Sequence, residues 1–199
     1  IKPNQRIVVL PNNDEPAHAM NNYNEKETIL MLQDPSTQQK AFERIVKAYS
    51  EQLYWQIRRM VVSHDDAQDL LQETFLKVYR SWDSFKGNSS LFSWLYRIAT
   101  NVVLSSLRSK HPEGTQLDEV KGMAADSYFE FSDEEAVALQ RAIHSLPPKQ
   151  QAVFNMRYYD EMSFKEIADI NDCSENSAKA NYHFAKTKIV ELMKRYITT

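Results

Sequence analysis

Glycine and cysteine are scarce in this chain, and long apolar runs are missing. The three glycines among 199 residues, at positions 87, 114 and 122, do not have the spacing of a glycine-rich phosphate-binding loop. One cysteine, Cys173, excludes an internal disulfide framework and is consistent with a reducing compartment. No apolar run approaches the roughly 20 residues that a membrane-spanning helix needs. We therefore expect a cytoplasmic protein without direct membrane insertion.

Motifs for catalysis and metal binding are also missing. No serine, cysteine or lysine lies in a recognisable nucleophile motif. The carboxylates of Asp65, Asp66 and Asp69 suggest Mg²⁺, but helix capping and a docking face explain them with fewer assumptions. The five histidines are scattered without metal-ligand spacing: His18, His64, His111, His144 and His183. We predict no enzymatic activity, no metal site and no cofactor.

Helical periodicity is abundant and strand-like alternation is scarce, so the predicted fold class is all-α with two small helical domains. The first domain is expected at 24–110 and the second at 132–199. Between them, 111–131 reads as an acidic flexible linker, since 111–135 holds eight acids against one lysine. Residues 1–23 contain three prolines and clustered asparagines, which predicts a weakly structured tail.

Two helical patterns, joined by a break at 83–90, organise the first domain. Each pattern carries one apolar stripe, and a third stripe at 42–57 should pack on the first of them. We expect His64 and Asp65 to cap the first helix with Gln68 returning the cap, and Trp94 to belong to the core. The stripes are Ala67, Leu70, Leu71, Phe75, Val78 and Tyr79, and Leu91, Trp94, Leu95, Ile98, Ala99 and Val102.

Charge is distributed unevenly along the chain. The net charge of −3 argues against DNA binding, but two segments are basic. Residues 97–110 hold three basic side chains and no acid, and 174–199 hold five against two acids. This arrangement permits local phosphate contacts while keeping the non-specific DNA affinity of the free chain low.

The second domain has the pattern of a helix-turn-helix. A helix at 148–158 precedes a capping box, Ser163 with Glu166, which opens a short helix. A three-residue turn at 171–173 leads to Ser174, a good cap for a final long helix. Short helix, tight turn and long helix are typical of a helix-turn-helix.

The first turns of the outer side of the final helix should present polar residues. Its opposite face should point into the domain, with Ala178, Tyr182, Ala185, Ile189, Leu192 and Tyr196. A recognition helix reads the major groove with residues near its amino end. Lys179 would bond guanine or a phosphate, Asn176 would pair with adenine, and Ala180 would contact a thymine methyl. A helical surface without a DNA role has the same periodicity. The candidate contacts are Asn176, Ser177, Lys179, Ala180 and His183.

The residue motifs of both domains indicate a family more specifically than the helical periodicity does. D-A-x-D-L-x-Q-E-x-F at 66–75, followed by F-x-G-x-S-x-x-x-x-W-L-Y-R-I-A-x-N at 85–101, resembles region 2 of bacterial sigma factors, in their extracytoplasmic-function (ECF) group. L-P-x-K-Q from 146, M-S-F-K-E-I-A at 162–168 and S-E-N-S-A-K at 174–179 resemble region 4. Ala180 stands where a serine is common, and Asn181 and Phe184 replace an arginine-rich continuation.

The resemblance implies a promoter-specificity subunit of RNA polymerase that reads the minus-thirty-five and minus-ten elements and promotes DNA melting. Its partners would be core RNA polymerase and promoter DNA, and a membrane-tethered anti-sigma factor is common in the family. The residues implied for core polymerase are Asp66, Asp69, Leu70, Gln72 and Glu73. Those implied for the melted minus-ten strand are Phe85, Lys86, Asn88, Ser89, Ser90, Arg97 and Asn101. The helix-turn-helix candidates would contact the minus-thirty-five element.

Two other readings stay open on the residues alone. A stand-alone helix-turn-helix regulator would bind duplex DNA unaided, with the first domain serving dimerisation or ligand binding. A helical protein-interaction adaptor would bind no DNA. The loop at 85–91 favours the sigma factor, because aromatic and amide side chains beside cations suit unstacked bases, whereas a duplex-binding regulator has no use for them.

Overall fold

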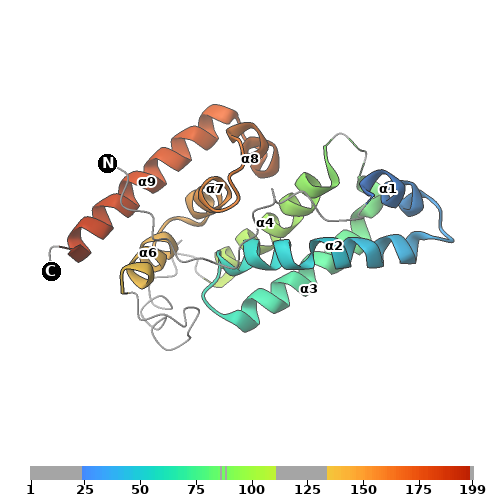
Figure 1. Cartoon of the computed structure of the whole chain (residues 1–199), viewed down its shortest axis with the longest axis horizontal. Helices are drawn as coiled ribbons and strands as arrows, with labels where there is room; N and C mark the ends of the chain where they lie inside the picture. Colours follow the sequence, from blue (N-terminus) through green and yellow to red (C-terminus); the bar gives the residue numbers. More distant parts are fainter. Residues whose placement is uncertain (1–23, 86, 88, 111–133, 198–199) are drawn as a thin grey trace.

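A computed structural model describes residues 24–85, 87, 89–110 and 134–197. Within these ranges the chain forms eight α-helices, one 3₁₀ turn and no strand (Figure 1), which confirms the predicted all-α class. The predicted tail and linker lie outside the described residues. The elements are α1 (Glu25–Gln33), α2 (Gln38–Arg58), α3 (His64–Ser81), η1 (Trp82–Ser84), α4 (Leu91–Lys110), α6 (Glu134–His144), α7 (Pro148–Tyr158), α8 (Phe164–Asn171) and α9 (Glu175–Ile197).

Helices α1 to α4, here called the amino-terminal unit, pack through the stripes that the sequence predicted. Helix α2 lies against α1, α3 and α4, and α3 also contacts α4. The ring of Phe42 meets Phe75 and Tyr79 edge-on, with centroids 6.3 and 5.1 Å apart. Leu53 and Leu95 are fully buried, as an apolar stripe facing a neighbouring helix requires.

The helix starts of this unit are capped by Asn24 and Ser63, and the second of these corrects a prediction. Asn24 caps α1 by accepting a hydrogen bond from the Glu27 backbone, although the Glu27 side chain pairs with Arg44 instead of returning the cap. For α3, the prediction of a cap at 64–65 was wrong. Ser63 is the N-cap, because its hydroxyl reaches the Asp66 amide while residues 64 and 65 already have helical geometry. Gln68 bonds the His64 ring.

Helices α6 to α9, here called the carboxy-terminal unit, form the predicted helix-turn-helix. The Ser163–Glu166 capping box is present in full at the start of α8. Helix α8 ends at Asp172, whose left-handed backbone (φ 50°) turns the chain sharply. Ser174 then accepts a hydrogen bond from the Ser177 amide and starts α9. The predicted inner face is correct for the residues whose burial is described: Ala178, Ala185 and Ile189 are buried, and Tyr182 and Leu192 half-buried.

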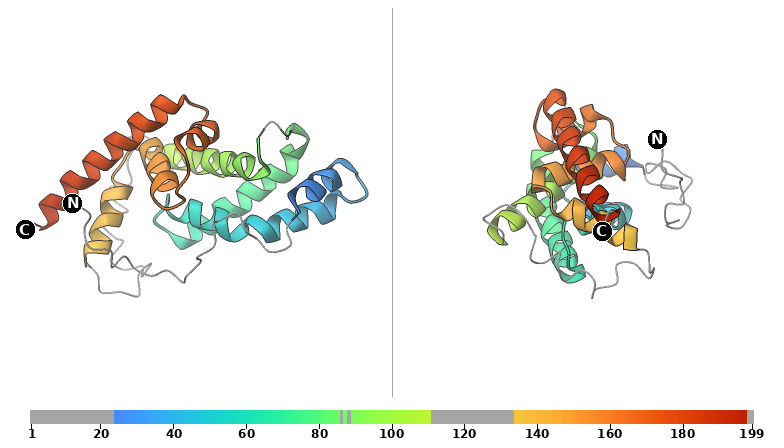
Figure 2. Two further views of the ribbon diagram at one scale, coloured as in Figure 1. Left: turned by 45° about the horizontal axis from the view of Figure 1, so that its top comes forward. Right: turned by 90° about the vertical axis from the view of Figure 1, so that its left-hand side faces the viewer.

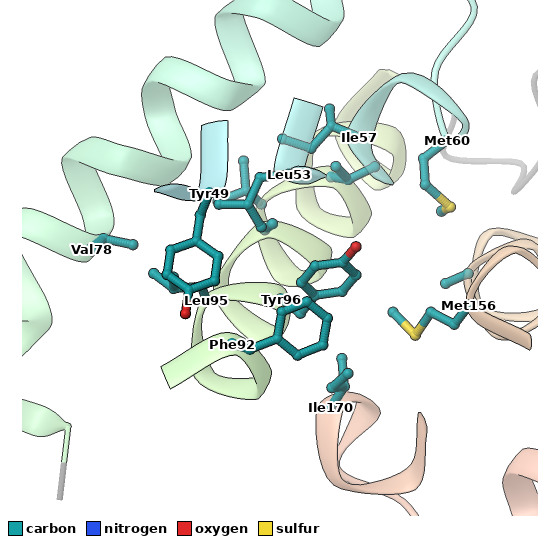
Figure 3. Packing of buried hydrophobic residues seen from close by; sticks show 14 of the residues in the cluster. Tyr49, Leu53, Ile57, Met60, Val78, Phe92, Leu95, Tyr96, Met156 and Ile170 are labelled. Carbon is teal, nitrogen blue, oxygen red and sulfur yellow. The ribbon is translucent and has the colours of Figure 1, made fainter. Parts of the chain in front are cut away.

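The two units pack against each other, which the sequence patterns did not predict. Helices α7 and α8 lie on α4, in both views of Figure 2. Met156 and Ile170 point toward Phe92 and Tyr96 of α4 (Figure 3), and all four side chains are buried. One apolar core therefore runs from the amino-terminal unit into α7 and α8. A smaller cluster between α6, α7 and α9 belongs to the carboxy-terminal unit alone.

Candidate nucleic-acid and polymerase interfaces

The outer face of α9 presents every residue that the sequence proposed for the major groove. All five side chains are exposed on the first two and a half turns: Asn176, Ser177, Lys179, Ala180 and His183. The buried Ala178 and the half-buried Tyr182 hold the opposite side of these turns against the unit. An exposed, rigidly supported amino end is the arrangement with which a recognition helix enters the major groove.

Lys179 is the cation at the centre of this face. Its Nζ lies 2.6 Å from a Glu175 carboxylate oxygen and 6.0 Å from the centroid of the Phe164 ring. Both side chains of the ion pair are about half exposed (51% and 48%), so the pair contributes little stability and a phosphate can compete for the lysine. The Lys179 ammonium is therefore available to DNA at little cost.

The loop after η1 brings an aromatic ring and hydroxyl groups to the start of α4. The half-buried Phe85 ring lies 5.3 Å from the ring of Trp94, so Trp94 supports the loop from the partly buried side of α4. Ser90 caps α4, since its Oγ accepts a hydrogen bond from the Ser93 amide. Gly87 is exposed at φ +71°, a backbone conformation in which any side chain would be strained. Lys86 and Asn88 lie outside the described residues.

A residue that the sequence reading missed anchors the end of this loop. The Glu25 carboxylate of α1 accepts a hydrogen bond from the Leu91 amide at 3.0 Å, and its other oxygen lies 3.4 Å from the Tyr49 hydroxyl. A carboxylate at the amino end of a helix is also favoured by the helix dipole. No local pattern relates residues 25 and 91, which are 66 positions apart.

Asn101 and Arg97 lie one turn apart on α4 but differ in accessibility. Asn101 is exposed, as a base-contacting amide must be. Arg97 is half-buried, and its guanidinium Nη2 donates to the backbone carbonyl of Asp169 in α8. The structure therefore leaves Asn101 accessible and holds Arg97 at the contact between the units.

The outer face of α3 carries the residues proposed for core polymerase. Asp69, Gln72 and Glu73 are exposed, and Glu73 pairs with Lys77 along the helix at 2.8 Å. Asp66 pairs with Lys110 of α4 at 2.7 Å. Leu70 is only 7% exposed, so it supports this face from the core.

A buried polar group lies between the two units. Gln151 Nε2 is 3.0 Å from the His144 Nδ1 and 3.1 Å from the Arg59 carbonyl oxygen, and donates to both. Burial, with the nearby Arg58 charge, lowers the pKa of His144 to about 4, so the ring is neutral near pH 7. The Asp160 carboxylate binds the Arg59 guanidinium at 2.5 Å. Burial raises the pKa of Asp160, and the Arg59 charge opposes that rise.

The described part of the chain lacks two features. No group of three histidine, cysteine, aspartate or glutamate side chains comes together as metal ligands would. Among the described helices, none has the length and apolarity to cross a bilayer.

The fold and these faces define a class: a two-unit helical protein that combines a helix-turn-helix with a helical unit carrying a polar loop. Comparison with known families narrows the class. The family described as Sigma-70 region 2 matches residues 45–112, and Sigma-70, region 4 matches residues 136–189.

Similar curated proteins carry sigma-factor names. The chain is 32% identical over 164 residues to the ECF RNA polymerase sigma-E factor of Escherichia coli (strain K12), covering 76% of this chain and 85% of that protein. It is 32% identical over 158 residues to the ECF RNA polymerase sigma factor SigW of Bacillus subtilis (strain 168), covering 73% and 84%. The chain belongs to the ECF group of RNA polymerase sigma factors.

Solved structures share the fold. The sigma factor RpoE, in complex with the anti-sigma factor NepR from Bartonella quintana, has a TM-score of 0.60 and 23% identity and covers 78% of this chain and 98% of its own. CnrH, in complex with the cytosolic domain of CnrY, has a TM-score of 0.60 and 21% identity, covering 84% and 97%. At these identities the likeness concerns the fold alone.

Proposed function

We propose that this chain acts as a promoter-specificity subunit: it binds core RNA polymerase, recognises the minus-thirty-five and minus-ten elements and promotes DNA melting. The main support for the proposal is that one chain has both an exposed recognition-helix face and a separate loop with an aromatic ring and hydroxyl groups. Duplex reading and base capture need such different surfaces. The domains that we assign are 24–110 and 132–199, joined by 111–131.

The α9 face is the proposed reader of the minus-thirty-five element. The residues are Asn176, Ser177, Lys179, Ala180 and His183, all exposed. Lys179 suits guanine or phosphate and Asn176 suits adenine, while Ala180 offers a methyl group for thymine. After Lys179 the helix continues with Asn181 and Phe184 instead of an arginine-rich stretch.

The loop and α4 are the proposed site for the melted minus-ten strand. Phe85, Ser89, Ser90 and Asn101 supply an aromatic edge, hydroxyls and an amide, and Arg97 would supply a cation once it is free of α8. Lys86 and Asn88 belong to the same proposed site by their sequence positions.

The outer face of α3 is the proposed contact with core polymerase. Asp69, Gln72 and Glu73 are exposed donors and acceptors on adjacent turns, and Asp66 joins them at the amino end of the helix. Leu70 belongs to this site as a buried support. Since the polymerase does the chemistry of transcription, we propose that the chain itself is not an enzyme, needs no cofactor and works in the cytoplasm.

An anti-sigma factor is a proposed further partner. The two structural neighbours were solved in complex with NepR and with the cytosolic domain of CnrY. Their fold, shared by this chain, supports a regulator of the same kind. A membrane-tethered form of that regulator is part of the proposal.

The test is electrophoretic mobility of promoter fragments with and without core polymerase at physiological salt. The fragments are those that co-purify with the holoenzyme, so no promoter sequence has to be assumed. We expect a retarded complex only when both the chain and core polymerase are present. Retardation by the chain alone would instead identify a stand-alone helix-turn-helix regulator, and binding to neither would favour an adaptor.

A further inference from the structure

We propose that Ala180 and Phe184 of α9 form an apolar strip that reads thymine in the minus-thirty-five element by contact with its 5-methyl group. This inference rests on the proposed function, which puts the outer face of α9 in the major groove. It goes further by adding Phe184, which the candidate contacts did not include, and by naming the base that this residue selects.

Phe184 is an exposed aromatic side chain on a long helix. It is 61% exposed, and among the residues whose burial is described no other phenylalanine, tyrosine or tryptophan is as accessible. A phenylalanine left in water forgoes the favourable free energy that burial of its apolar surface would give. Single exposed apolar residues are common on protein surfaces, so exposure alone assigns no role. The position of the ring on α9 decides what it can contact.

The ring of Phe184 continues the face proposed to read the duplex. Residues four apart on a helix are neighbours on its surface, so Phe184 follows Ala180 one turn further along α9. The ring lies 6.3 Å from the His183 ring, centroid to centroid, at an interplanar angle of 63°. On the other side of the same turn, Ala185 is buried against the unit. Phe184 is therefore accessible beside two of the proposed DNA contacts.

The charges along this part of α9 favour DNA over a second copy of the chain as the partner of the ring. Residues 176–190 include three lysines, at 179, 186 and 188, and no acid. The acid that precedes them, Glu175, is paired with Lys179. Such a surface attracts a polyanion, whereas pairing it with itself in a dimer would bring lysines together.

The strip selects thymine because its side chains have no hydrogen-bonding group. Each base pair presents a distinct pattern of donors and acceptors in the major groove, and thymine adds a methyl group. The Ala180 methyl and the Phe184 ring offer apolar contact, for which that methyl is the partner. An arginine would instead bond guanine. Phenylalanine in place of the arginine-rich continuation thus shifts the preference from guanine to thymine.

The spacing of the strip predicts the spacing of the thymines. A helix rises about 1.5 Å per residue, which places the Cα atoms of Ala180 and Phe184 about 6 Å apart along α9, while stacked base pairs are about 3.4 Å apart. The two contacts should therefore fall on thymines about one or two base pairs apart, on either strand.

The test replaces thymine by uracil, which still pairs with adenine and lacks the 5-methyl group. The protein is the full chain assembled with core polymerase, and the DNA is a promoter fragment that co-purifies with the holoenzyme. Each thymine of the minus-thirty-five element is replaced singly, and affinity is measured by competition at fixed salt. Phe184→Ala removes the ring, and Phe184→Leu keeps an apolar side chain. Leu30→Ala is the matched control, because Leu30 is 66% exposed on α1, outside the proposed sites.

We expect uracil to weaken binding of the original holoenzyme about three- to fivefold at each contacted thymine, the effect of one methyl group removed from an apolar contact. At the thymine read by Phe184, uracil should change the affinity of Phe184→Ala by less than about 1.5-fold, since the coupled partner is already missing. Phe184→Leu and Leu30→Ala should keep most of the uracil effect. Ala180→Gly should remove the effect at the second thymine in the same way.

Two results would overturn the contact. In the first, no uracil substitution weakens binding, or its effect is the same with and without the Phe184 ring, while the holoenzyme still binds the promoter; the proposed function then stands without the inference. In the second, Phe184→Ala dissociates a dimer of the free chain and uracil has no effect, which would assign the ring to a contact between copies.

Failure of the proposed function gives a different result. The chain alone would then retard the fragment without core polymerase, and the same uracil scan on the chain alone would still decide whether Phe184 reads thymine. If neither the chain nor its mixture with core polymerase binds any fragment, the proposed function and the thymine contact both fail.

Discussion

The two surfaces assigned to DNA differ in how they depend on the rest of the molecule. The α9 face is exposed in all five proposed contacts, and α9 packs on α6, α7 and α8 of its own unit. The surface on α4 includes Arg97, which α8 engages, and a loop whose end is anchored by Glu25 of α1. The first surface is complete within one unit, whereas the second depends on where the other unit lies. On the proposed assignment, duplex reading and strand capture are separable activities.

The largest expected effect is on the stability of the carboxy-terminal unit. Ile143 is fully buried in the small cluster that this unit does not share. Ile143→Ala should cost about 2–5 kcal/mol of unfolding free energy, since it leaves a cavity in a core with few other members. All three tryptophans, Trp55, Trp82 and Trp94, lie in the amino-terminal unit. In a urea titration of Ile143→Ala, the helical circular dichroism signal should therefore begin to fall at a lower urea concentration than in the original chain. The midpoint of the tryptophan fluorescence transition should stay unchanged.

The control for this prediction is Val190→Ala on the exposed side of α9, which should leave both curves unchanged within about 0.5 kcal/mol. A shift of the tryptophan transition by the same amount as the dichroism transition would show that the units unfold together. That result would contradict the distinction between the core that both units share and the smaller cluster within the carboxy-terminal unit.

The next effect is a pH dependence arising at His144. Its pKa is about 4 in the folded chain against 6.5 unperturbed, so the unfolded chain binds the proton first as pH falls. The stabilisation is complete above pH 6.5 and is lost between pH 6.5 and 4, by up to about 3 kcal/mol. His144→Leu should remove this loss, seen as a smaller difference in unfolding free energy between pH 7 and pH 4.5.

Asp160, with its raised pKa, contributes in the opposite direction: the stabilisation from its protonated form grows as pH falls and is lost as pH rises. Because Asp160 is present in both proteins, the difference between them isolates His144. His183→Leu, on the exposed face of α9, is the matched control and should keep the original pH dependence. If the pH dependence of the unfolding free energy were unchanged in His144→Leu, its assignment to His144 would be refuted.

A smaller pair of effects distinguishes polymerase binding from strand opening. Asn101→Ala should lower open-complex formation by roughly tenfold, on the order of one lost hydrogen bond to a base, and leave the affinity for core polymerase unchanged. Asp69→Ala should weaken binding to core polymerase, but strand opening should be normal once the concentration of the variant chain saturates the polymerase. Permanganate reactivity of thymines and a binding titration measure the two quantities. Equal losses of both activities in each variant would count against separate surfaces.

The smallest effect concerns the α9 surface. Lys179→Ala should weaken holoenzyme binding to the promoter a few-fold, and should reduce the slope of log affinity against log salt by about one if the lysine contacts a phosphate. Lys40→Ala, an exposed lysine of α2, should change neither quantity. An unchanged slope together with altered base preference at one position would instead assign Lys179 to a guanine.

Much of the fold followed from local patterns. The helix at 148–158, the Ser163–Glu166 capping box and the inner face of α9 are set by periodicity and capping within a few residues, so sequence reading found them. The cap of α3 was misplaced by one or two residues, because Ser63, His64 and Asp65 all suit a helix start and only the backbone geometry separates them.

Contacts between residues far apart in the sequence could not be predicted from local patterns. Arg59 meets Asp160 across 101 positions and Glu25 meets Leu91 across 66, and neither pair belongs to a spacing rule. Arg97 was expected as a DNA contact from its motif, but its hydrogen bond with the Asp169 carbonyl depends on how two separately patterned units dock. Met156 and Ile170 are buried against α4 at this contact, and an apolar periodicity does not specify which helix such residues will meet.

The most direct measurement is permanganate reactivity of a co-purified promoter incubated with core polymerase, with and without the chain. We predict thymine reactivity confined to the minus-ten region that requires both proteins, and that is lost when Phe85 and 87–90 are replaced by a neutral linker while core binding persists. Melting by core polymerase alone, or melting that continues unchanged with the replaced loop, would contradict the account.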